Sequence, residues 1–296
     1  KYLYTIPNFQ NPSGITMSLE KRRQVYELCR DYNVLILEDN PYGDLRFSGE
    51  DLPSIKSFDK EGVVMYAGSF SKVISPGMRV GYAIGPQEVV QKMVVCKQGE
   101  DVHSNIWAQI ICHRMLTQRD YEAHLRRLRE IYRRKSAVLL QAMEEHFRPL
   151  ISWNPFEGGL FAWCTLPKGM DMLDFVKRGA ERKVCVVPGT AFLTDEAVPC
   201  QSFRINFSTP TDEQLKEGVR ILGEIAREMP GWFSLLPGET NFAALVMEDG
   251  QGVQQELLRR GVAVRYTGGL LRVTCGLPEE NQAFLQAFQN IGRGWI

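Results

Sequence analysis

Four short apolar segments place the strongest constraint on the fold of this chain. They are rich in β-branched and aromatic residues and cover residues 2–6 (YLYTI), 34–38 (VLILE), 63–67 (VVMYA) and 80–84 (VGYAI). Apolar runs of this length are typical of strands buried on both faces, which occur in parallel or mixed sheets covered by helices. We therefore predict an α/β fold built on a mainly parallel sheet.

The segment between the first two predicted strands has the pattern of an amphipathic helix. Ser18 stands at the N-cap position, Glu20 falls in the first turn, and Val25, Leu28 and Cys29 recur at helical spacing. The succession of strand, helix and strand predicts one βαβ unit.

The rest of the chain has a different organisation. Residues 86–147 predict two long helices with a break around 117–120, and strands and helices alternate at shorter spacing from residue 155 onward. This change predicts a second, smaller α/β domain, with a boundary near 148–154. The final segment repeats the order of elements of that domain, which indicates a duplication, with chance similarity of ordinary α/β elements as the alternative. We expect three parts, at residues 1–150, 151–229 and 230–296.

The composition is that of a globular protein without a net charge. Of the 296 residues 44% are hydrophobic, and 35 Lys and Arg balance 35 Asp and Glu, so no whole-molecule field attracts nucleic acid or an anionic membrane. The second long helix does carry basic residues, namely Arg126, Arg127, Arg129, Arg133, Arg134 and Lys135. An apolar stripe on the same helix favours a solvated face over a nucleic-acid interface. We expect small-molecule partners, with no nucleic acid and no membrane.

The cysteines and the first residues bear on the cellular context. Seven scattered cysteines never form a C-x-x-C pair, which predicts neither a metal site nor a disulfide framework and favours a reducing cytoplasm. No apolar run reaches the ~18 residues of a membrane span, and the first residues lack a signal-peptide pattern. Because a predicted strand follows Lys1 directly, we expect that part of a domain precedes it.

Three motifs follow the predicted strands: NPSG at 11–14, EDNPYGDLRF at 38–47 and GSFSKVISPGMRVGY at 68–82. Open α/β sheets bind ligands beyond the carboxyl ends of their strands, so we expect the three motifs to meet at one crevice. A single loop lysine such as Lys72 is usually a solvated surface group. Its small hydroxyl and glycine neighbours and a following arginine instead predict a phosphate cradle around an amine that can form a Schiff base.

Asp39 ends the apolar segment VLILED, and by itself it could be a helix cap or a turn residue. Beside a lysine that holds an aldehyde cofactor, an ionised carboxylate is what a pyridinium nitrogen requires, because a protonated nitrogen makes the ring an electron sink. The combination of Asp39 and Lys72 is more specific than either residue.

These motifs resemble those of the fold type I, pyridoxal-phosphate-dependent class I/II aminotransferases, and within them the aminoadipate/kynurenine and aromatic branch. The resemblance runs from Tyr2 to about residue 228 and implies a homodimer that transaminates an amino acid with a 2-oxo acid. It implies that Lys72 binds pyridoxal 5'-phosphate covalently and that Arg204 binds the substrate carboxylate. The other implied contacts are Asp39 with the ring nitrogen, Asn11 and Tyr42 with the ring O3′, and Ser69, Ser71 and Arg79 with the phosphate.

The chain departs from that family in two places. The N-terminal part of the family, with a glycine-rich turn and an aromatic residue that stacks on the ring, has no counterpart here. We therefore expect the chain alone to bind the cofactor weakly and to have little activity. The tail, residues 230–296, resembles instead the C-terminal small domain of histidinol-phosphate-type aminotransferases, in which Arg272 would match the carboxylate arginine.

Two other interpretations stay open. The chain could be the aminotransferase-like effector domain of a transcription regulator with a helix-turn-helix upstream, although such regulators tend to have an EDDYD-like segment where this chain has EDNPY. It could also be an inactive truncated or fused aminotransferase. No residue pattern identifies the amino acid substrate.

Overall fold

A computed structural model describes residues 1–195, 197–229, 234–236, 242–247 and 249–294. They divide into two compact units, which are described separately. Unit 1 comprises Lys1–Ala137, Asn154–Trp163 and Asn206–Thr209, and unit 2 comprises Val138–Trp153, Cys164–Ile205 and Pro210–Ile296. Segments 154–163 and 206–209 thus join the N-terminal part of the chain, while the three-part division at residues 150 and 229 remains a prediction.

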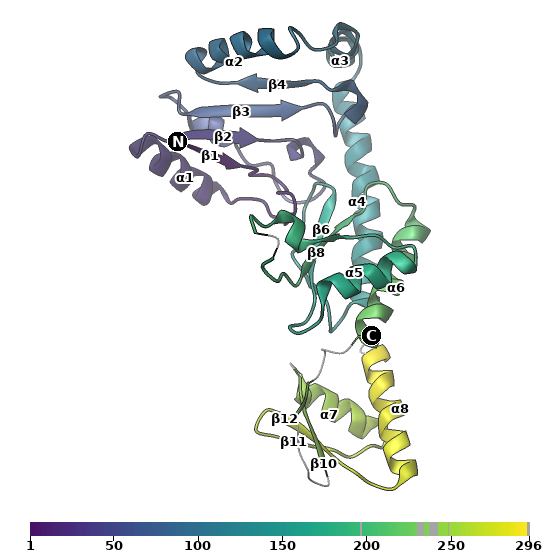
Figure 1. Cartoon of the computed structure of the whole chain (residues 1–296). Coiled ribbons are helices and arrows are strands. Elements are labelled where there is room, and N and C mark those ends of the chain that lie inside the picture. Colours follow the sequence, from purple (N-terminus) through teal and green to yellow (C-terminus); the bar gives the residue numbers. More distant parts are fainter. Residues whose placement is uncertain (196, 230–233, 237–241, 248, 295–296) are drawn as a thin grey trace. The chain divides into compact units, whose positions relative to one another are not determined.

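The first sheet has the order β1-β2-β3-β4, and all four strands coincide with predicted segments. β1, β2 and β3 are parallel, whereas β4 is antiparallel to β3, as the arrow directions in Figure 1 show. The strand bounds are Tyr2–Thr5 (β1), Leu35–Asp39 (β2), Val64–Ser69 (β3) and Gly81–Ile84 (β4). The prediction of a mainly parallel, mixed sheet is confirmed.

Helix α1 (Leu19–Asp31) connects β1 to β2 and completes the predicted βαβ unit. The Ser18 hydroxyl accepts a hydrogen bond from the backbone N–H of Lys21, as an N-cap does. Tyr26 and Cys29 pack against Ile36 of β2 and Val64 of β3. The expected apolar face was wrong at Leu28, which is exposed, because the buried positions of this helix are 22, 26 and 29, spaced by four and three residues.

The prediction that all four strands are buried on both faces was wrong for the two edge strands. Ile36 and Glu38 of β2 and Val64 of β3 are fully buried, but β4 is exposed along its whole length and β1 along most of it. Among the described residues each edge strand has one neighbouring strand, and helix α2 (Gln87–Glu100), which follows β4, has no buried residue. Apolar side chains of the edge strands therefore remain on the surface.

Three helices, not two, follow β4: α2 (Gln87–Glu100), α3 (Ile106–Gln118) and α4 (Tyr121–His146). The break between α3 and α4 lies where it was predicted. The unpredicted break lies at residues 101–105, where the Asn105 side chain accepts hydrogen bonds from the N–H groups of Trp107 and Ala108 and starts α3. Asn at an N-cap was the available sequence signal.

A second four-stranded sheet has the order β5-β6-β8-β7. Its strands and accompanying helices are β5 (Ser152–Trp153), β6 (Phe161–Thr165), α5 (Met172–Glu181), β7 (Val187–Pro188), β8 (Ser202–Asn206) and α6 (Asp212–Glu228). β5 pairs antiparallel with β6, and β7 pairs antiparallel with β8. Phe175 of α5 and Phe203 of β8 are fully buried and in ring contact, which joins helix and sheet.

A third, antiparallel sheet in the tail has the order β11-β12-β10-β9. Its elements are β9 (Ser234–Leu236), β10 (Phe242–Val246), α7 (Gly250–Arg259), β11 (Arg265–Thr267), β12 (Leu270–Thr274) and α8 (Pro278–Gly294). Leu245, Leu257, Leu271 and Phe288 form its core. Residues 237–241 of the predicted repeat lie outside the described residues.

Two further predictions concern membranes and disulfides. None of the described helices has the length and apolar character needed to cross a membrane. All seven cysteines are free thiols.

Candidate active site

Two parallel strands of unit 1 bring the motif residues to the edge of the first sheet at which the carboxyl ends of its parallel strands lie. Asp39 ends β2 and lies in register with Ala67 of β3, to whose carbonyl the N–H of Asn40 donates over 2.9 Å. Ser69 ends β3 two residues further along, about 7 Å at the rise of a strand. The carboxylate of the second motif and the first hydroxyl of the third therefore leave the same sheet edge.

The loop after β3 holds Ser69, Ser71 and Lys72 together. The Ser69 hydroxyl donates to Ser71 Oγ over 2.9 Å and accepts from the N–H of Ser71 over 3.1 Å. The half-buried Lys72 amine has no ion pair or hydrogen bond with the described residues. The next residue, Val73, is buried among Tyr42, Leu45 and Phe161. This packing fixes the backbone at Lys72 and leaves its amine available.

Arg79 lies in the same loop, at the end of a short 3-10 helix, Pro76–Met78. Its backbone is left-handed, with φ 53°, and its Nη1 donates to the carbonyl of Pro76 over 3.2 Å. The side chain is exposed. The structure thus places Arg79 in the predicted loop, with its guanidinium on the loop's own backbone.

Tyr42 and Asn11, the two predicted partners of a ring oxygen, come from the other two motifs. Tyr42 is buried, and its ring meets the Phe161 ring edge-on at 5.7 Å between centroids. Asn11 is half-buried in the loop after β1, where Gln10 Nε2 donates to its carbonyl over 2.8 Å. Both residues belong to unit 1, as do Asp39 and Lys72.

A hydrogen-bond network that the sequence did not indicate ties the first two motif loops together. Asn8 Nδ2 donates to Asn40 Oδ1 over 2.8 Å, and Asn40 Nδ2 donates to the Tyr66 hydroxyl over 2.7 Å. Arg22 is fully buried and donates to Asn8 Oδ1 and to the carbonyls of Pro7, Met17 and Pro53. These bonds compensate a guanidinium that burial would otherwise penalise, and burial lowers its pKa despite the charge of Glu38.

Two more residues at this edge were missed, because their partners are distant in sequence. The Tyr4 hydroxyl on β1 donates to Asp39 Oδ2 over 2.6 Å. His124 Nε2 on α4 lies 2.7 Å from the carbonyl oxygen of Val73, beside Lys72. Because a carbonyl only accepts, Nε2 carries the proton in this contact. Neither a strand tyrosine nor a helix histidine signals such a contact in the sequence.

The two predicted carboxylate-binding arginines belong to unit 2. Arg204 is half-buried on β8 in register with Val187 of β7, and its guanidinium lies over the Phe192 ring at 5.1 Å. Arg272 is half-buried on β12, with its guanidinium over the Phe242 ring at 3.8 Å. Each arginine thus lies beside an aromatic face, a favourable environment for a cation.

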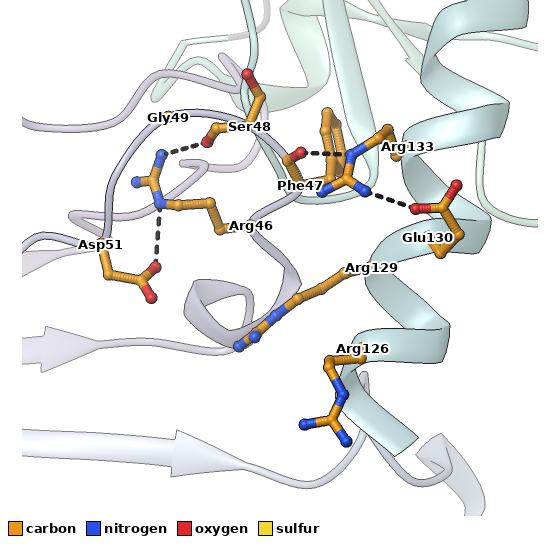
Figure 2. A pocket seen from close by; sticks show the side chains of 9 residues that line it. All are labelled: Arg46, Phe47, Ser48, Gly49, Asp51, Arg126, Arg129, Glu130 and Arg133. Atoms are coloured by element: carbon orange, nitrogen blue, oxygen red, sulfur yellow. Dashed lines mark hydrogen bonds and ion pairs between the residues drawn. The ribbon is translucent and has the colours of Figure 1, made fainter. Parts of the chain in front are cut away.

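The basic residues of α4 also line a cavity of about 480 Å³ in unit 1 (Figure 2). The lining residues are Arg46, Phe47, Ser48, Gly49, Asp51, Arg126, Arg129, Glu130 and Arg133. Figure 2 shows Arg46 paired with Asp51, and Arg133 with Glu130 and the carbonyl of Phe47.

Carboxylates and carbonyls of the same unit therefore pair with most of these arginines. Arg129 donates to the carbonyl of Asp44, and Arg126 lies 3.7 Å from Asp120. Arg126 and Arg133 are more than half exposed, as predicted for a solvated face. The prediction was wrong at Lys135, which is only 9% exposed.

Comparison with known proteins identifies the family. Residues 4–222 match the sequence model of the family described as aminotransferase class I and II. The chain therefore belongs to the class I and II aminotransferases, a family that depends on pyridoxal 5'-phosphate.

Individual relatives place it near the aromatic, kynurenine and aminoadipate enzymes. Aromatic-amino-acid aminotransferase 1 of Thermococcus litoralis is 37% identical over 228 residues, 77% of this chain and 54% of the relative. The 2-aminoadipate transaminase of Thermus thermophilus is 34% identical over 239 residues, 80% of this chain and 59% of the relative. The chain spans little more than half the length of these curated relatives.

A solved structure confirms the fold. The kynurenine aminotransferase of Pyrococcus horikoshii, in complex with PMP, superimposes with a TM-score of 0.74 at 36% identity, covering 77% of this chain and 56% of that one. That share of the chain has the fold type I aminotransferase structure. A more distant match, at 31% identity over 227 residues, is the uncharacterized HTH-type transcriptional regulator YisV of Bacillus subtilis, covering 77% of this chain and 46% of the regulator.

Proposed function

We propose that this chain forms the lysine-bearing part of the cofactor site of an aminotransferase that exchanges amino groups between an amino acid and a 2-oxo acid. One observation carries the proposal. Within unit 1 the Asp39 carboxylate, the Ser69–Ser71 hydroxyl pair and the Lys72 amine follow the ends of the adjacent strands β2 and β3. Family membership supports the same activity.

The chemistry of these side chains fits pyridoxal 5'-phosphate. A carboxylate suits the protonated ring nitrogen, an amide and a phenol suit the ring oxygen, and hydroxyls with a guanidinium suit the phosphate. We assign these contacts to Asp39, to Asn11 and Tyr42, and to Ser69, Ser71 and Arg79. When bound, the cofactor supplies an electron sink for charge that develops at the substrate Cα.

Lys72 has two tasks in this proposal. Its amine would hold the cofactor covalently before the substrate binds, and as a free amine it would remove the substrate Cα proton and return it as a general base and acid. The fixed backbone at Val73 limits the positions this amine can reach. Asp39 meanwhile opposes the positive charge of the ring nitrogen.

Reductive labelling tests the assignment of Lys72. The chain is incubated with pyridoxal 5'-phosphate, reduced with borohydride and mapped by peptide mass spectrometry. We expect the pyridoxyl group on Lys72 and no specific label in the Lys72→Arg variant, which retains the positive charge. A stoichiometric label on another lysine would contradict the proposal.

Arg204 is the proposed ligand of the substrate α-carboxylate. Its guanidinium can bind a carboxylate through two parallel N–H bonds, and its position beside the Phe192 ring restricts its orientation. The names of the relatives suggest aromatic amino acids, kynurenine or 2-aminoadipate as amino donors.

We further propose that the tail is a second copy of the small domain, of the type that follows the large domain in histidinol-phosphate aminotransferases. Both copies have the order of two strands, helix, two strands, helix. Both sheets have the same strand order, because β9-β10-β12-β11 corresponds to β5-β6-β8-β7. Helices α5 and α7 both have 10 residues, and α6 and α8 both have 17.

Local details support this correspondence. Asp171 and Asp249 cap α5 and α7 through their side chains, and a left-handed residue follows each helix, Lys183 in one copy and Gly261 in the other. Arg204 and Arg272 both occupy the third position of a five-residue strand. A crystal structure of the tail, aligned with residues 151–229, would test the duplication. A strand order that differs from β5-β6-β8-β7 would contradict it.

A regulatory effector domain is the second candidate, supported by the match to the HTH-type regulator. The EDNPY segment favours the enzyme. The two functions differ in turnover, because an effector domain can bind the cofactor without exchanging amino groups. The test uses a protein of the relatives' full length and measures by absorbance whether an amino acid converts the bound cofactor to its amino form. Conversion would support the enzyme, and binding without conversion would support the regulator or an inactive relative.

The remaining proposals concern assembly and location. Exposed apolar side chains on α3 and β4, including Trp107 at 72% and Ile84 at 53% exposure, support association into a homodimer. Sedimentation equilibrium tests this, and a monomer at high concentration would contradict it. The free thiols are compatible with a cytoplasmic location.

A further inference from the structure

We propose that Tyr4 is a positioning residue for Asp39, whose carboxylate it holds in one orientation so that the second oxygen stays available to the cofactor ring. This inference rests on the proposed function. It adds a residue from β1 to a site that the three motifs alone would place on the loops after β1, β2 and β3.

The contact between the two side chains is short and specific. The Tyr4 hydroxyl donates to Asp39 Oδ2 over 2.6 Å, a length typical of a bond to an ionised carboxylate. β1 runs parallel to β2, and Tyr4 is in register with Leu37. Asp39 lies two residues beyond Leu37, so the tyrosine ring extends along β2 from Leu37 to Asp39. Among the described residues, no other hydrogen bond or ion pair reaches the Asp39 carboxylate.

A carboxylate without a donor has little preference for one orientation, because the last torsion of Asp is broad. A single strong bond to Oδ2 restricts the carboxylate plane and leaves Oδ1 without a partner among the residues that the structure describes. Preorganisation of this kind strengthens a contact, since the ligand does not bear the cost of ordering the group. Tyr4 therefore acts on the cofactor through Asp39.

The hydroxyl remains a donor over the working pH range. Tyr4 is 51% exposed, but the partial burial of its phenol, the hydrogen bond to Asp39 and the charge of Asp39 all raise its pKa, and the neighbouring Tyr42 adds to the shift. The phenol thus stays protonated at neutral pH and can only donate to the carboxylate.

Tyr2 provides a matched control. It lies two residues before Tyr4 on β1, hence on the same face of the strand, and is 71% exposed. Tyr2→Phe removes the same atom from the same strand without touching Asp39. Asp39→Asn keeps the shape of the acceptor and removes its charge.

The first measurement uses the ligand-free chain. Tyrosines labelled with ¹³C at Cζ are titrated by NMR, and the Tyr4 signal is assigned with Tyr4→Phe. We expect Asp39→Asn to lower the pKa of Tyr4, because the charge and the charge-assisted bond are lost. An unchanged Tyr4 titration in that variant would overturn the contact.

The second measurement is the Kd for pyridoxal 5'-phosphate, with a double-mutant cycle. We expect Tyr4→Phe to raise Kd roughly tenfold, as for loss of a hydrogen bond to a charged group, and Tyr2→Phe to leave it unchanged. In the Asp39→Asn background, where the acceptor is a neutral amide, Tyr4→Phe should have a clearly smaller effect. A purely structural role of Tyr4 would instead weaken binding equally in both backgrounds.

The outcomes separate this inference from the proposed function. If the unsubstituted chain does not bind the cofactor and Lys72 is not labelled, the proposed function fails, and this inference fails with it. If Lys72 is labelled but Tyr4→Phe binds as tightly as the unsubstituted chain, or the two substitutions have additive effects, only the role of Tyr4 is overturned.

Discussion

At the scale of single residues, Asp39 has the most consequential charge in the proposed site. An amide at this position can accept a bond from Tyr4 but cannot keep the ring nitrogen protonated. We expect Asp39→Asn to retain covalent cofactor attachment and to slow Cα proton removal roughly 10²-fold or more. Single-turnover absorbance with a deuterated amino acid, in a protein of the relatives' full length, measures that step.

The control for this substitution is Asp31→Asn, at the exposed end of α1, where the carboxylate pairs only with Arg30 among the described residues. It should leave proton removal unchanged. If Asp39→Asn also left the rate unchanged, Asp39 would not stabilise the charge that develops during the reaction.

Individual contacts also mark the limit of sequence reasoning in this site. Asp39 and Lys72 were predicted because each follows a recognisable strand within a motif. Tyr4 and His124 were not, because their contacts join residues 35 and 51 positions apart. Such contacts depend on strand register and helix placement, which the spacing of residue types does not determine.

At the scale of elements, one buried carboxylate holds the turn that leads into β3. The Asp59 side chain is fully buried and accepts bonds from Lys56 Nζ and from the N–H groups of Val63 and Val64. Burial alone would raise the pKa of Asp59, but these donors outweigh it and lower the pKa below its usual value. We expect Asp59→Asn to reduce the free energy of unfolding by about 2 kcal/mol, measured by urea denaturation.

The pH dependence has a definite sign. The pKa of Asp59 is lower in the folded than in the unfolded state. Its contribution to the free energy of unfolding is therefore fully present above the unfolded pKa of about 3.9 and is lost as the pH falls through the folded pKa. Asp59→Asn should lack this part of the acid-induced loss of stability. Glu61→Gln, an exposed change in the same turn, should retain it; identical acid profiles for both variants would contradict the assignment.

Elements were predicted better than their burial. The four strands and α1 were recognisable because apolar runs and a Ser cap record local preferences. The exposure of β1 and β4 was not predicted, because burial depends on what covers a strand. The same apolar sequence can form a covered strand or an exposed edge strand. The break before α3 was missed because DVHSN lacks glycine and proline, and only Asn105 marked it.

At the scale of the whole molecule, the proposed duplication of the small domain raises the question of whether Arg204 or Arg272 binds the substrate carboxylate beside Lys72. We expect Arg204, because its domain follows α4 directly in the chain, whereas Arg272 comes after that domain is complete. Loss of a charge-assisted bidentate pair of about 1.5–3 kcal/mol corresponds to a roughly 10- to 150-fold rise in KM for the amino acid.

Steady-state kinetics of Arg204→Ala and Arg272→Ala, in a protein of the relatives' full length, measure this difference. Arg272→Ala is the matched control, since it removes the same side chain from the equivalent strand position. A rise in KM confined to Arg272→Ala would mean that the tail supplies the substrate-binding domain.

The discontinuity of unit 1 has a consequence for how the chain must be made. Phe47 and Leu45 exchange backbone hydrogen bonds with Glu157 and Gly159, and the Phe47 ring contacts that of Phe207. A ribosome that adds about 5–20 residues per second therefore finishes the first 137 residues several seconds before it delivers Phe207. During that interval the nascent chain exposes aromatic side chains that only later residues can cover, so its period of greatest dependence on chaperones falls between the synthesis of α4 and that of α6.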